Sequence, residues 1–200
     1  RGLKMVSLLI HLPPGSEDVE KGGRDERDVV EETISPAEFM YNILSSTATK
    51  GFKADFYGQR HIGLEVIAVN NSINFYVAAP LALIDVVEQA VTSAYPAARI
   101  EEVEEHNLFN EVGKVGGVSG GEIHLTKDFA YPIATFKETR RDTMQSLLNS
   151  LISLDKQDGV GFQILLRPAH ENWSKKAALV ASDKKSGKKS KKGLSLNSLP

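Results

Sequence analysis

Residues 61–79 read HIGLEVIAVNNSINFYVAA, and this stretch decides the fold. Apolar side chains recur at every second position on both sides of Asn70-Asn71, a pattern that is typical of half-buried β-strands. Asparagine tolerates the positive φ angles that a two-residue hairpin turn requires. The stretch therefore predicts two antiparallel strands with one shared apolar face. The side chains of that face are Ile62, Leu64, Val66, Ala68, Ile73, Phe75 and Val77.

A helix is predicted before this hairpin. Ser35 is placed as its N-cap, Pro36 as its first helical residue, and Glu38 completes a capping box. Lys50-Gly51 provides the stop signal. The apolar stripe at helical spacing comprises Phe39, Met40, Ile43, Leu44 and Thr47.

A second helix is predicted after the hairpin, opened by Pro80 and stopped by Tyr95-Pro96. Residues 5–12 alternate in the manner of a first strand, and residues 98–103 predict a short, charged strand at a sheet edge. The resulting order, β-α-β-β-α-β, is that of ferredoxin-like folds. We therefore expect an α+β protein with a ferredoxin-like domain over residues 1–104. The stripe of the second helix comprises Leu83, Val86, Val87, Ala90, Val91 and Ala94.

The amino-acid composition of the chain changes after residue 104. Five glycines between Gly113 and Gly121 predict a connector over residues 105–121. A second, smaller β(β)αβ unit is expected over residues 122–170: strands at 122–126 and 133–136, a helix after Asp142, and a strong strand at 160–167. Residues 171–200 are predicted to form a short helix and a lysine-rich tail. The acidic segment 13–34 lacks periodicity and is interpreted as a disordered loop whose role stays open.

The charge of this 200-residue chain is uneven. Six lysines lie between Lys184 and Lys192, and no acidic residue follows them. Removing these six positive charges from the net charge of -2 leaves about -8 on the rest of the chain. Such a body is a poor general nucleic-acid surface, because that binding depends on neutralising phosphates with Lys and Arg.

The tail itself has two interpretations: a solvated linker, or a contact with DNA or anionic lipid. The lysines concerned are Lys184, Lys185, Lys188, Lys189, Lys191 and Lys192.

Motifs that would indicate catalysis or a cofactor are absent from the sequence. Gly113-Lys114 is followed by Val115, so it is no P-loop, and neither a dinucleotide fingerprint nor a Gly-x-Ser-x-Gly elbow occurs. With no cysteine there is no thiolate zinc site. Glu122 and His124 could supply two metal ligands, but the spacing suggests no third. We therefore expect no catalytic residue, cofactor or metal, and an undetected hydrolase is the least favoured alternative.

Two features bear on partners and location. Trp173, close to Arg167 and the exit of the last strand, is predicted to anchor the core or a subunit contact. No apolar run approaches the ~20 residues of a membrane helix. Because the chain begins Arg-Gly instead of Met, we expect it to be an excerpt from a longer protein.

Five stretches carry a family resemblance by their order along the chain: SLLIHLP (7–13), NFYVAAP (74–80), AYPAARIEEV (94–103), YPIATFK (131–137) and QILLRPA (163–169). Together they resemble the N-terminal accessory region of membrane-associated, conjugation-type motor ATPases of the type IV secretion class, from bacteria of reduced genome. The resemblance implies a tether, a docking surface or an oligomerisation element at the cytoplasmic face of the inner membrane, and it carries over no catalytic residue. The implied partners are a second copy of the chain or the motor domain of the same parent protein, with the membrane reached only through flanking segments. A nucleic-acid-binding module that uses the lysine tail is the alternative.

Overall fold

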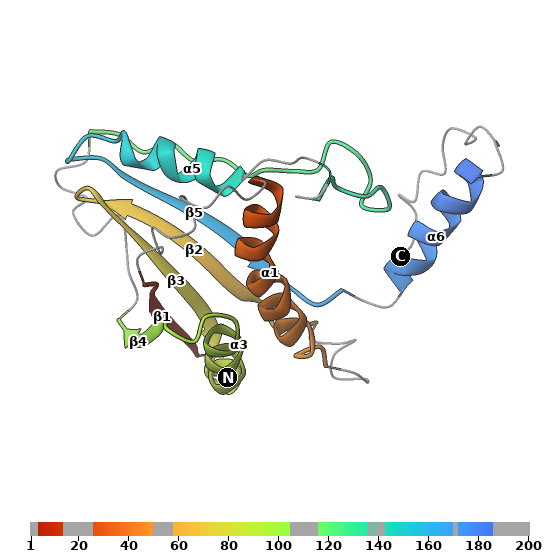
Figure 1. The fold of residues 1–200 in the computed structure, drawn as a ribbon, viewed down its shortest axis with the longest axis horizontal. Coiled ribbons are helices and arrows are strands. Elements are labelled where there is room, and N and C mark those ends of the chain that lie inside the picture. Colours follow the sequence, from red (N-terminus) through yellow and green to blue (C-terminus); the bar gives the residue numbers. More distant parts are fainter. Residues whose placement is uncertain are drawn as a thin grey trace. The chain divides into compact units, whose positions relative to one another are not determined.

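The computed structural model describes residues 4–13, 26–49, 58–104, 116–135, 138, 143–169 and 172–185. Contacts divide the chain into two compact units. The first, the sheet unit, consists of Arg1–Val118 and Ala134–Pro168, and the second consists of Ser119–Ile133 and Ala169–Pro200. Figure 1 shows the helices and strands of both.

The fold is α+β, as predicted, with a five-stranded antiparallel sheet in the order β4-β1-β3-β2-β5 and four helices among the described residues. The strands are β1 (Met5–His11), β2 (Ile62–Val69), β3 (Ser72–Pro80), β4 (Arg99–Val103) and β5 (Gly159–Leu166). The helices are α1 (Glu26–Ser45), α3 (Ile84–Ala94), α5 (Thr143–Ile152) and α6 (Asn172–Lys185), with a short 3-10 turn, η2 (Leu81–Leu83).

The predicted hairpin is confirmed as β2 and β3. Asn70 and Asn71 have φ angles of 51° and 60°, the left-handed values that a tight turn between twisted strands requires. The turn fixes the register, in which Val69 lies opposite Ser72 and Val66 opposite Phe75. This places the apolar side chains of both strands on one face, against the helices.

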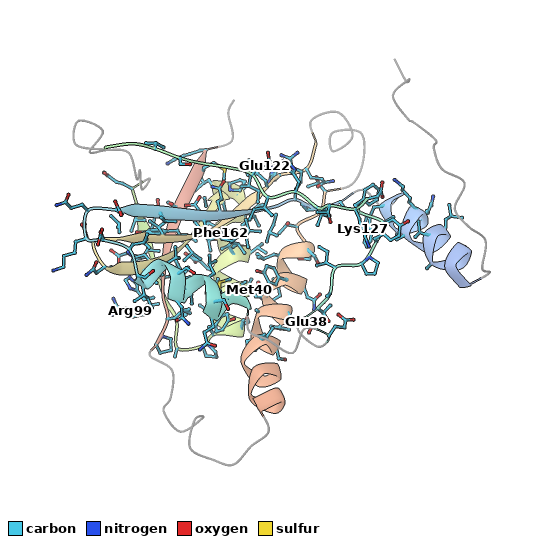
Figure 2. All side chains as sticks on the ribbon, turned by 90° about the horizontal axis from the view of Figure 1, so that it is seen from above. Glu38, Met40, Arg99, Glu122, Lys127 and Phe162 are labelled. Atoms are coloured by element: carbon cyan, nitrogen blue, oxygen red, sulfur yellow. The ribbon has the colours of Figure 1, made fainter. Side chains whose placement is uncertain are left out.

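Helices α1, α3 and α5 all lie on that face of the sheet (Figure 2). One core cluster joins β1, β2 and β3 to α1 and α3, and its least exposed members include Leu8 at 1% and Val87 and Ala90 at 0%. A second cluster joins the other end of the hairpin to α5, where Leu151 packs with Val66 and with the half-buried Phe162 of β5. Burial of these apolar side chains is the main favourable term that holds the helices on the sheet.

The predicted start and end of the first helix are wrong. The helix α1 begins at Glu26, so Ser35 is not its N-cap and Pro36 lies inside it. Residues 26–34, interpreted as part of the acidic loop, are instead helical; their Glu and Arg residues have good intrinsic helix propensity. Residues 14–25 of that loop lie outside the described residues.

The helix ends at Ser45, ahead of the predicted stop signal, which lies outside the described residues. The hydroxyls of Ser45, Ser46 and Thr47 donate to the carbonyls of Asn42, Ile43 and Leu44 at 2.8, 2.6 and 2.7 Å. Side-chain hydroxyls thus satisfy the last carbonyls of α1, which have no partner within a helix.

The second helix agrees more closely with its prediction. Leu83, Val87, Ala90 and Val91 of the predicted stripe are buried, and the backbone N–H of Tyr95 closes the helix on the carbonyl of Val91 at 2.8 Å. Pro80, however, ends β3, and η2 separates it from α3. The charged strand predicted at 98–103 is confirmed as the edge strand β4.

The smaller unit expected after the glycines differs from the structure in two respects. The strong strand predicted at 160–167 forms as β5, but it pairs with β2 and extends the first sheet. Residues 122–126 form no strand, and neither do the described residues 133–135. Alternation alone cannot make a strand, because its N–H and C=O groups need a neighbouring strand to pair with. Consistent with this, Ile123 is 85% exposed.

Candidate interaction surface at the sheet edge

Strand β5 forms one edge of the sheet. It pairs along its whole length with β2, from Ile62 opposite Leu166 to Val69 opposite Gly159. No other strand of the described chain pairs with it, so β5 is hydrogen-bonded into the sheet on one side only. The main-chain groups of the outer side can therefore pair with a further strand, as at any sheet edge.

The composition of β5 leaves this edge unprotected. Its sequence, GVGFQILL, is 8 residues long and contains neither a charged residue nor a proline. Ile164 and Leu165 are 37% and 61% exposed. Sheet edges normally avoid this combination, because charges, prolines, bulges and short length are the features that prevent pairing with other chains. An edge of this kind is typical of a site where another strand binds.

The opposite edge, β4, has the protective features. It is 5 residues long and reads RIEEV. The carboxylate of Glu101 pairs with the imidazole of His11 on β1, with 3.2 Å between Glu101 Oε2 and His11 Nε2. Arg99, Glu101 and Glu102 are all exposed, so a strand approaching this edge would meet three charged side chains.

A row of side chains on the face away from the helices links the two edges. Register places Glu101 opposite Leu9, Leu9 opposite Tyr76, Tyr76 opposite Glu65, and Glu65 opposite Gln163. At the β5 end, Gln163 Nε2 donates to Glu65 Oε1 at 2.7 Å. Burial of Tyr76, and then the charge of Glu65, raises the pKa of the Tyr76 hydroxyl.

A hollow of about 480 Å³ also lies on this face, at the end of the sheet where β1 begins. It exists because the side chains opposite one another there are small: Ser7 pairs with Ala78, which pairs with Gly63. Four charged residues line it: Lys4, Glu65, Glu102 and Glu104. Among the described residues, no histidine lines it.

Histidines and carboxylates do not assemble into a metal site in the described part of the chain, where no group of three potential ligands occurs. Glu122 and His124 do approach one another, with 3.5 Å between Oε2 and Nε2, but both are largely exposed. The pair therefore lies on the surface, although not on the strand expected for it. His106 and His170 lie outside the described residues.

The predicted anchor residues fall in different units. Arg167 follows β5 in the sheet unit and is exposed, whereas Trp173 is in α6 of the second unit and is 50% exposed. Trp173 belongs to neither core cluster, so its predicted subunit contact stays a prediction. Among the tail lysines, Lys184 and Lys185 end α6, and the other four lie outside the described residues.

The second unit has a contact that the sequence analysis did not find. Lys176 of α6 donates from Nζ to Asp128 Oδ2 at 2.7 Å and lies 4.5 Å from the centre of the Phe129 ring. The hydrogen bond from Lys176, and next that from the Ala130 backbone N–H, lowers the pKa of Asp128. The local sequence signal was Asp128, since aspartate often forms a turn in which its side chain accepts a hydrogen bond from the backbone N–H two residues later. Here that N–H is the one of Ala130. Its long-range partner could not be read from sequence spacing.

These features define an α+β domain with one charged and one uncharged sheet edge. The chain belongs to the family of the domain of unknown function DUF8128, whose model matches residues 30–195. No curated protein matches the chain, and no solved structure does. None of the described helices is long and apolar enough to cross a membrane.

Proposed function

We propose that the chain is a non-catalytic accessory domain that assembles or positions a membrane-associated motor ATPase of the type IV secretion or conjugation class. The uncharged edge strand β5 is the observation that carries the assembly role. Partners of such a domain are a second copy of itself or the motor domain of the same parent protein. The parent protein would act at the cytoplasmic face of the inner membrane, in translocation of DNA or protein.

The edge supports an assembly role because it supplies binding energy without a preformed pocket. In β-strand addition, main-chain hydrogen bonds give affinity and alternate side chains give specificity. The 8 residues of β5 provide the hydrogen-bonding groups, and the exposed Ile164 and Leu165 provide apolar contact. A partner strand would also cover side chains that otherwise lie in water at the edge.

We further propose that residues 5–103 form a ferredoxin-like unit to which β5 has been added. The strand order β4-β1-β3-β2 and the placement of α1 and α3 on one face support this arrangement. In such a unit β2 would be the edge strand. The addition of β5 moves the edge outward by one strand and replaces a strand that contains Glu65 by one without charge.

The open reading frame that encodes the chain is the most direct test. We expect a Gly-x-x-x-x-Gly-Lys-Ser/Thr motif downstream and an apolar segment of ~20 residues upstream. The second test is the assembly state of the motor with and without this domain, measured by light scattering. Deletion of the domain should reduce oligomerisation of the motor. A reading frame without a nucleotide-binding motif would contradict the motor, and unchanged oligomerisation would contradict the assembly role.

The rival function, nucleic-acid binding through the lysine tail, predicts a different result. DNA affinity should fall steeply with salt and disappear when residues 184–192 are deleted. Under the assembly proposal, that deletion leaves oligomerisation of the motor unchanged, because β5 lies outside the tail.

A further inference from the structure

We infer that β5 pairs antiparallel with β5 of a second copy of this chain, which joins two sheets into one continuous ten-stranded sheet. The inference deepens the proposed assembly function, on which it rests, by naming the partner and the contact. A two-fold axis perpendicular to the sheet relates the copies and keeps the helices of both on the same face. Pairing of a strand with its own copy in this way is a closed, isologous contact.

Charge selects β5 over β4 for pairing between identical copies. When a strand pairs with itself, every charge on it also occurs on its partner, and like charges on facing strands are destabilising. On β4, Glu101 and Glu102 would approach their own copies. On β5 no residue carries a charge, so this cost is absent.

The lack of charge also favours a second copy over a partner of a different kind. A strand from another protein is usually chosen by charges or pockets that complement its own side chains. The exposed side chains of β5 provide only apolar and amide groups. Their complement is another uncharged strand, and β5 itself meets this requirement.

The sizes and directions of the side chains predict the register in which two β5 strands pair. Val160, Phe162 and Leu166 face the helices, so residues of odd number face the other side. A pairing centred on Gln163 keeps these faces, and it sets Leu165 of one copy opposite Gly161 of the other. The side chain of Leu165, which is 61% exposed, then lies where the partner has no side chain. On the helix face, Phe162 lies opposite Ile164 and Val160 opposite Leu166.

The contact is expected to be weak for free copies. Two 8-residue strands bury less than the ~1,200 Å² at the lower end of stable interfaces. Flexible tethering of two binding modules creates an effective concentration in the millimolar range. Copies held together by flanking segments of a parent oligomer would therefore pair, while isolated copies pair only at high concentration.

Cysteine cross-linking tests the pairing directly, because the chain has no native cysteine. In the register above, residue 163 of one copy lies opposite residue 163 of the other. At high protein concentration, Gln163→Cys in the full 200-residue chain should therefore form a disulfide-linked dimer under a mild copper-phenanthroline oxidant. Gln89→Cys makes the same change at an exposed position of α3, away from both edges, and is the matched control that should stay largely monomeric. Equal yields at the two positions, or no dimer at either, would overturn the inference.

Sedimentation velocity provides a test that does not depend on a cysteine. Leu165→Lys adds the charge that natural edges use for protection, and it should weaken self-association about tenfold or more. Leu81→Lys makes the same change at a side chain of similar exposure, 55% against 61%, away from the edge, and should leave association unchanged. In a tandem fusion of two copies, tethering favours pairing within one molecule, so the Leu81→Lys fusion should sediment as a more compact species than the Leu165→Lys fusion. Equal sedimentation of the two fusions contradicts the pairing.

Failure of the inference can be told apart from failure of the proposed function. If β5 does not self-pair, but Leu165→Lys alone prevents binding to a motor domain from the same reading frame, then the edge has a different partner and the assembly role stands. If β5 self-pairs in a protein whose reading frame contains no motor, then the pairing stands and the motor assignment fails.

Discussion

The two edge strands of this sheet differ in how far they are protected against pairing with other chains. Both β4 and β5 have a neighbouring strand on one side only in the described chain. The strand β4 is short and carries Arg99, Glu101 and Glu102, whereas β5 is longer and carries no charge. Unpaired edges invite association with other chains, and charge is a common means of preventing it. The difference means that charge protects β4 against pairing with a further strand and that β5 lacks this protection.

The inner strand β1 and the edge strand β5 differ in how deeply their apolar side chains are buried. Leu8 of β1, which supports β4, is 1% exposed and belongs to the larger core cluster. Phe162 of β5 is only half-buried, between β5 and α5 (Figure 2). Leu8 is therefore more deeply buried than Phe162.

The largest effect is expected from Leu8→Ala, which should lower the free energy of unfolding by about 3 kcal/mol because it leaves a cavity in the core. Phe162→Ala should cost clearly less, about 1 to 2 kcal/mol, because part of that ring is already in water. Urea unfolding followed by circular dichroism measures both. Leu81→Ala, at an exposed position, is the control and should stay within about 0.5 kcal/mol of the parent chain. A Phe162→Ala cost equal to that of Leu8→Ala would show that β5 is as firmly held as β1.

Neutralising β4 should remove the difference between the edges. Glu101→Gln with Glu102→Gln deletes two negative charges, and self-association through β4 should become several-fold to about tenfold stronger. A chain that can pair through both edges forms open assemblies instead of a closed dimer. Species larger than a dimer should therefore appear in sedimentation velocity as concentration rises.

Adding Leu165→Lys to this variant should return it to small species. The control, Asp85→Asn with Glu88→Gln, removes the same charge from the exposed face of α3. Enlargement of this control to the same extent would assign the effect to net charge, and not to the edge.

Sequence patterns predicted the hairpin and the charged edge because both depend on local features. Positive φ angles at Asn70 and Asn71 follow from the side chain of asparagine, and the alternation around them fixes which face is buried. The position of β5 in the sheet could not be predicted in this way, because nothing within residues 159–166 indicates which strand lies beside it. Its pairing with β2 arises from contacts nearly a hundred residues apart. The edge could therefore not be recognised as an edge from the sequence, although its lack of charge was visible.

Local signals also misled the prediction at two places. The Ser-Pro-x-Glu pattern at Ser35 has the form of a helix start, but α1 already extends from Glu26, and Pro36 is accommodated inside it. Residues 122–126 alternate like a strand but find no pairing partner among the described residues. At Ser35 the helix propensity of the preceding residues outweighs the local start signal, and at residues 122–126 the alternation has no described strand to pair with.

Tyr76 lies in the middle of the row of side chains that links the two edges. It should give a smaller, pH-dependent change in the stability of the fold. Burial, with the charge of Glu65, raises the pKa of Tyr76 above its ordinary value of about 10. Between these two pKa values the folded chain keeps a proton that the unfolded chain has lost, so stability falls as pH rises above about 10. Tyr76→Phe should reduce this fall, and Glu65→Gln should lower the Tyr76 pKa in an ultraviolet titration of tyrosinate. A Tyr76 pKa that is the same with and without the Glu65 charge would contradict the coupling along the row.

The smallest effect concerns the link between β5 and the rest of the sheet. Gln163→Ala removes the hydrogen bond from Gln163 to Glu65, whose net contribution at an exposed site is about 0.5 kcal/mol. Global stability should barely change, but amide hydrogen exchange along β5 should become faster than along β4, because β5 opens locally. A mutation at Thr92, which donates to the carbonyl of Glu88 within α3, is the control, and Thr92→Ala should leave exchange in β5 unchanged. If Gln163→Ala accelerates exchange equally in both edge strands, then β5 opens only with the whole sheet, and the two edges are held by the same cooperative unit.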